Sequence, residues 1–151
     1  MIHRIVTTIV THLNDHMNTV CPGGRRSRAV AAELRGTPTT PLAALRDRLV
    51  VQVVRIEEQP VVRQAEPRRA GAAPPALAID LICAGCFDDH QAGLEVLSAA
   101  IDCVRNAPVI TGADGLTVRM TLQPMSWEAQ GQLWGQLQHP YLPSIVIRAT
   151  G

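Results

Sequence analysis

The stretch that decides the fold runs from residue 115 to residue 147 and contains GLTVRMTL (115–122), MSWE (125–128), QLWG (132–135) and YLPSIVI (141–147). The β-branched and apolar residues of 116–122 predict a strand. Ser126 is placed to cap a helix that carries Leu133, Trp134 and Leu137. Two prolines then mark a turn before a final strand over 144–149. This third of the chain therefore predicts strand, capped helix, strand.

Upstream, apolar residues of 2–17 recur at spacings of three and four, which predicts a helix with one buried face. Residues 49–56 and 76–83 predict two strands. Asp88 is expected to cap a helix that ends near Asn106, with Gln91 completing a capping box. The buried face of that helix is expected to hold Leu94, Leu97, Ile101 and Val104.

Residues 20–47 form a Pro-, Gly- and Arg-rich segment, expected to be a flexible insert with a short half-helix over 29–34. Residues 65–75 predict a surface loop. At 151 residues and 46% hydrophobic content, one domain over 1–151 can bury a core. The predicted fold class is α/β, with helices covering a mixed sheet of about four or more strands.

The charge balance is nearly neutral. The 14 basic residues, all of them Arg, face 13 carboxylates, for a net charge of +1, so no overall field favours nucleic acid. The N-terminus is a poor signal peptide, and no apolar run reaches the ~18 residues of a membrane helix. We therefore expect a protein kept in the reducing cytoplasm, with no membrane partner and with free cysteines.

Cys83-Ala-Gly-Cys86 is the motif that most suggests chemistry, because thiol oxidoreductases place a C-x-x-C between a strand and a helix. Two aspartates follow it, however, and their negative charge opposes a reactive thiolate. Packing is the favoured interpretation, and a small thiol or zinc protein is kept as an alternative. His12 and His16 lie four apart on the first helix, where a solvated edge is favoured over a metal site.

Motifs of common enzymes are absent from the sequence: it contains no G-x-S-x-G, no phosphate-binding loop with its Lys, and no H-E-x-x-H. Adjacent carboxylates at 57–58 point to opposite faces of a strand and cannot act together. We therefore predict no catalytic residue, no metal ligand and no cofactor.

Two arginine clusters and one aromatic group are candidate contact sites. The clusters suit bidentate pairing with a neighbour's carboxylates, and a nucleic-acid adaptor is the alternative. Trp127 and Trp134 lie two helical turns apart, so both are expected in the core, although one of them together with Tyr141 is a candidate interface anchor. The predicted interface residues are Arg25, Arg26, Arg28, Arg63, Arg68, Arg69, Tyr141, Ile145 and Ile147.

The order and spacing of several short motifs resemble the tail-terminator (cap) proteins of extracellular contractile injection systems, of the antifeeding-prophage and virulence-cassette type, in their N-terminal domain. The resemblance covers residues 1–18 and 48–150. The motifs are VRIEE (54–58), FDDHQAGLEVLS (87–98), NAPVIT (106–111), GLTV (115–118), QLWGQL (132–137) and YLPS (141–144).

The resemblance implies a hexameric ring that closes the distal end of a contractile tail and contacts the inner-tube protein and the sheath protein. Polymerisation of both would stop there, with no active site involved. The segment 20–47 and the absence of a second domain after the last strand depart from the family pattern. Ring proteins need two complementary faces. We expect the 61–75 loop and the 20–41 segment at subunit or sheath contacts, and the 144–150 strand at a sheet edge, available to a neighbour's strand.

Overall fold

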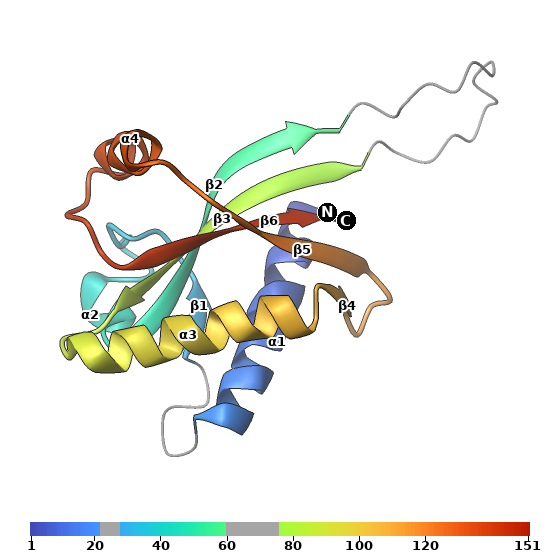
Figure 1. Ribbon diagram of the computed structural model, residues 1–151, viewed down its shortest axis with the longest axis horizontal. Helices are drawn as coiled ribbons and strands as arrows, with labels where there is room; N and C mark the ends of the chain where they lie inside the picture. The colour runs from blue at the N-terminus through green and yellow to red at the C-terminus, as the bar shows by residue number, and fades with distance from the viewer. Residues whose placement is uncertain (22–27, 60–75) are drawn as a thin grey trace.

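The computed structural model describes residues 1–21, 28–59 and 76–151. Within these residues, four helices pack on one six-stranded sheet whose strand order is β1-β2-β3-β6-β5-β4 (Figure 1). The elements are α1 (Ile2–Val20), β1 (Ala29–Ala31), α2 (Leu42–Leu45), β2 (Arg48–Glu58), β3 (Leu77–Cys86), α3 (His90–Asn106), β4 (Val109–Thr111), β5 (Thr117–Gln123), α4 (Trp127–Leu137) and β6 (Ser144–Thr150). The predicted α/β class with a mixed sheet is confirmed.

The sheet is antiparallel except at one edge. β1 pairs with β2 in parallel, whereas the four other strand pairs are antiparallel. β3 and β6 lie at the centre, and the short strands β1 and β4 lie at the edges. The expectation that the 144–150 strand forms an edge is wrong, because β6 is hydrogen-bonded to β3 on one side and to β5 on the other.

The larger core lies between one face of the sheet and the helices α1 and α3. The predicted spacing of α1 is confirmed, since Ile5, Ile9, Leu13 and Met17 are all fully buried. Burial of each such side chain contributes about 1.5–3 kcal/mol relative to exposure. Amphipathic spacing, rather than helix capping, therefore fixes α1 in place, because Met1 makes no side-chain cap.

The buried face of α3 differs from the predicted one. Leu97 and Val104 are buried, but Leu94 is 43% exposed and Ile101 is only half-buried. Val96 and four small residues fill the remaining core positions, the small ones being Gly93, Ala99, Ala100 and Cys103. Small side chains let α3 approach the sheet closely, so the face cannot be read from its large residues alone.

The cap of α3 is also one residue from its predicted place. Asp89 is the N-cap, and its Oδ1 accepts a hydrogen bond of 3.1 Å from the backbone N of Gln91. Asp88 instead forms an ion pair with Arg46, which lies just after α2. By contrast, the predicted cap of α4 is confirmed, with Ser126 Oγ accepting from Ala129 N at 3.1 Å.

A smaller core fills part of the opposite face beneath α2 and α4. It contains Leu34, Leu45, Val50, Ile82, Ala84 and Trp134. The expected half-helix over 29–34 is wrong, because residues 29–31 form β1 and Leu34 is buried. The described part of the 20–47 segment thus contributes a strand, a short helix and two core leucines, whereas residues 22–27 lie outside the described residues.

Candidate assembly interface

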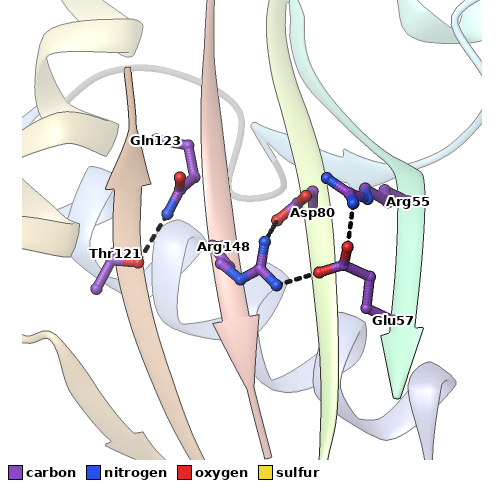
Figure 2. Close-up of polar contacts among 6 residues, drawn as sticks. All are labelled: Arg55, Glu57, Asp80, Thr121, Gln123 and Arg148. Atoms are coloured by element: carbon purple, nitrogen blue, oxygen red, sulfur yellow. Dashed lines mark hydrogen bonds and ion pairs between the residues drawn. The ribbon is translucent and has the colours of Figure 1, made fainter. Parts of the chain in front are cut away.

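The sheet face opposite α1 and α3 is covered by α2 and α4 over only part of its length. Toward the C-terminal ends of β2 and β6, that face carries charged and polar side chains (Figure 2). We call this region the polar face and define it by Arg55, Glu57, Asp80, Arg119, Thr121 and Arg148. These residues lie on the sheet face that points away from the larger core. Side chains alternate between the two faces of a strand, and Ile79, Leu81 and Ile147, next in sequence to Asp80 and Arg148, belong to the larger core.

Arg148 on β6 is the centre of an ion-pair network on the polar face. It pairs with Glu57 on β2, and its Nη1 lies 3.5 Å from Asp80 Oδ1 on β3. Arg55 also pairs with Glu57, as Figure 2 shows. The hydrogen bond from Arg148 holds the pKa of the Glu57 carboxyl below its usual value. The network thereby ties three strands together where no helix covers them.

The aromatic residues near α4 divide into a buried and an exposed group. Trp134 is 5% exposed and packs edge-on against Tyr141, with ring centroids 5.7 Å apart. Trp127 is 84% exposed, so its expected place in the core is wrong. It is the first residue of α4. Tyr141 is 59% exposed, and its predicted role as an anchor stays a prediction.

Ile145 and Ile147 face the inside of this chain. Ile147 is fully buried in the larger core, and Ile145 is half-buried beside it. Ile145 also lines a groove of about 300 Å³ between α3 and α4. A contact of Ile147 with a neighbouring chain would therefore require β6 to rearrange.

Most of the predicted arginine sites lie outside the described residues: Arg25, Arg26, Arg63, Arg68 and Arg69. Arg28 is described, and its Nη2 donates to the carbonyl oxygen of Cys21 at 2.7 Å. It therefore has a structural role at the end of α1. The arginines that the sequence analysis missed, Arg55 and Arg148, lie within strands, where alternation on the solvent face was the available signal.

The cysteines have the geometry of packing residues. Cys83 and Cys86 lie three apart on β3, so their side chains point to opposite faces of the sheet. Burial raises the pKa of the Cys83 thiol to about 12 and that of Cys103 to about 11, and it also raises the pKa of Cys86. This arrangement contradicts the alternative of a reactive dithiol.

The histidine pair of α1 has no third metal ligand beside it in the described part of the chain. Burial and the neighbouring His16 lower the pKa of His12, against the opposing effect of Asp15. Within residues 1–21, 28–59 and 76–151, no three His, Cys, Asp or Glu side chains come together as a metal site would require. No described helix is long and apolar enough to cross a bilayer.

Comparison with known proteins identifies the family. The model of the Pvc16 N-terminal domain matches residues 4–150. The chain belongs to this family. The resemblance inferred from the sequence motifs is thereby confirmed, and the match agrees with the prediction of a structural component rather than an enzyme. Comparison with curated protein sequences finds no match.

Two solved structures share the fold. The cryo-EM structure of the anti-feeding prophage cap, a tube-terminating cap, aligns with 92% of this chain and 51% of its own, at a TM-score of 0.59 and 18% identity. The PVC sheath/tube terminator in the extended state aligns with 92% of this chain and 54% of its own, at a TM-score of 0.58 and 17% identity. The chain therefore spans about half the length of these relatives.

Proposed function

We propose that this chain is a cap component of a contractile injection particle, where it terminates the inner tube and the sheath. The observation that carries the proposal is the fold shared with two terminator structures over 92% of the chain. The family match over 4–150 supports the same conclusion. Both relatives are described as terminators, one of the tube and the other of the sheath and tube.

The proposed assembly is a homo-hexameric ring of one domain per chain, formed in the cytoplasm and retained as part of the particle. A ring built from one kind of subunit needs two complementary surfaces on each copy. The polar face and the exposed aromatics Trp127 and Tyr141 offer surfaces outside the two cores. The inner-tube protein and the sheath protein are the proposed partners, contacted without any chemical step.

The test of the proposal is the mass of the purified chain, measured alone and after mixing with purified inner-tube protein or purified sheath protein. Light scattering is expected to give either a free particle of about six times 16.3 kDa or a gain of about that mass by the tube. Trp127→Ala serves as a folded variant that should weaken the contact if this residue is an anchor. A monomer that binds neither tube nor sheath protein would contradict the proposed function.

A further inference from the structure

Two stretches of the sheet's edges, at the same end of the molecule, have no strand partner among the described residues. β1 pairs only with residues 49–51 of β2, so the outer side of β2 beyond Val53 has no strand partner among the described residues. A register shift between Val53 and Arg55 limits the regular part of this edge to residues 55–58. At the opposite side, β4 pairs with β5 and has no described strand on its outer side.

The strand registers place these edges level with one another. Glu57 pairs with Ala78, Ala78 with Thr150, Thr150 with Arg119, and Arg119 with Val109. Four successive antiparallel steps separate β2 from β4, so the two strands run in the same direction. Copies related by rotation around a ring keep this direction, so β4 of one copy would meet β2 of the next as a parallel neighbour.

The backbone groups of β4 are arranged for such pairing. Met120 N donates to Pro108 O at 2.7 Å, and Gly112 N donates to Leu116 O at 2.8 Å. Alternation along an antiparallel ladder then turns the N–H and C=O of Val109 and Thr111 outward.

The same reasoning applies to β2. Gln59 N donates inward to Ala76 O at 2.9 Å. Alternation therefore turns the N–H and C=O of Ile56 and Glu58 outward. Each edge thus presents unpaired donors and acceptors at every second residue.

The chain already contains the pairing pattern that these groups would make. In the parallel pair β1–β2, Leu49 lies beside Ala29 while its N donates to Arg28 O at 2.8 Å. By analogy, Val109 would lie beside Glu57 and bond to the residues that flank it, Ile56 and Glu58. Val109 and Glu57 both project on the side of the polar face, so this register keeps every side chain on its own face.

Side-chain chemistry supports a second copy as the occupant. Each edge carries an exposed apolar residue, Ile56 at 52% and Val109 at 45% exposure. The two lie on opposite faces of the sheet, so each would be covered separately at the junction. The β2 edge carries two carboxylates, Glu57 and Glu58, whereas β4 carries no charged residue. Pairing of the β2 edge with itself would bring like charges together, so pairing of β2 with β4 is favoured over it.

We propose that β4 of one copy adds in parallel to residues 55–58 of β2 in the next copy, so that the sheet continues from subunit to subunit around the ring. This inference rests on the proposed ring but goes beyond it, because it names the two contacting strands and their register. The polar face would then continue across each junction.

The first test is disulfide cross-linking of the full chain with the double variant Glu57→Cys/Val109→Cys, and with Arg55→Cys/Val109→Cys for the register shifted by two residues. Oxidation of the Glu57→Cys/Val109→Cys variant is expected to link copies into a ladder of bands that ends at six chains on a non-reducing gel. The three single variants control for the native cysteines, and Val109→Cys/Trp127→Cys controls for exposed cysteines away from the edges.

The second test removes one outward N–H. Val109→Pro deletes that donor on an edge strand, where proline is tolerated, whereas Val109→Ala keeps it. Proline is expected to raise the concentration at which the ring dissociates at least about tenfold more than alanine does, with both variants folded by circular dichroism.

The outcomes separate the two proposals. A hexamer that forms without an inter-chain ladder, and that tolerates Val109→Pro, would overturn the strand pairing and leave the cap function standing. Failure of the unmodified chain to form a ring, alone or with the tube and sheath proteins, would overturn both.

Discussion

The two halves of the sheet differ in how they are covered. In one half, helices lie on both faces, and Leu49, Val50, Ile82 and Cys83 are fully buried between them. In the other half, α1 and α3 cover one face, and the polar face is held by the Arg148 network. Both halves contribute apolar residues to the larger core, but only the second leaves strand edges and charges available for assembly.

The largest expected contrast is between the two tryptophans of α4. Trp134→Ala should lower the free energy of unfolding by about 3–5 kcal/mol, because it removes a buried ring from the smaller core. Trp127→Ala should change it by less than about 0.5 kcal/mol, because the side chain is exposed. Urea unfolding followed by circular dichroism measures both. Equal effects would contradict the assigned burial.

The next contrast is between the two cysteines of β3. Cys83→Ser places a hydroxyl in the larger core and should cost about 1–3 kcal/mol of unfolding free energy. Cys86→Ser should cost less, because Cys86 is only half-buried.

Thiol reactivity gives an independent measurement of the same contrast. At pH 8 a disulfide reagent should modify Cys86 of the native protein before Cys83, since complete burial raises the pKa of Cys83 to about 12. Rapid modification of Cys83 in the folded chain would show that the covered half opens.

A smaller effect is expected at the start of α3, the helix that covers the larger core. Asp89→Ala removes the N-cap and should lower the free energy of unfolding by about 1 kcal/mol. Asp88→Ala should cost less, because its ion pair with Arg46 is exposed to solvent. Thermal unfolding of the two variants compares them directly, and a larger effect at Asp88 would reverse the assignment of the cap.

The smallest expected effect is a pH dependence of the polar face. Arg148 lowers the pKa of Glu57 below its ordinary value of 4.5, so the stabilisation is present above that value. It should be lost as the pH falls through the lower, folded pKa. The melting temperature of Glu57→Gln should therefore lie below that of the unmodified chain at pH 7 and approach it in acid. A difference that grew in acid would contradict the network.

The periodicity of the sequence predicted the long helices and strands and their order. It failed for the short strands, whose formation depends on tertiary contacts. α1, β3, β5 and the capped α4 follow from spacing and capping residues. β1 and β4 have three residues each and exist because a neighbouring strand pairs with them, which local propensity does not report.

The candidate interface was harder to predict than the fold. Tyr141 is exposed as an anchor must be, but the strand 144–150, expected at an edge, lies at the centre of the sheet. Arg148 was missed because its pairing with Glu57 joins strands far apart in sequence, and Arg55 joins this network through Glu57, two residues along the same strand. Strand order, which single-sequence patterns do not contain, decides which edges are open.

The most direct test of the central claim is the length distribution of injection particles assembled without this chain and with it restored, measured by electron microscopy. A terminator should convert tubes and sheaths of variable length into particles of one length, each with density at the distal end. Particles of one uniform length assembled in the absence of the chain would contradict the account.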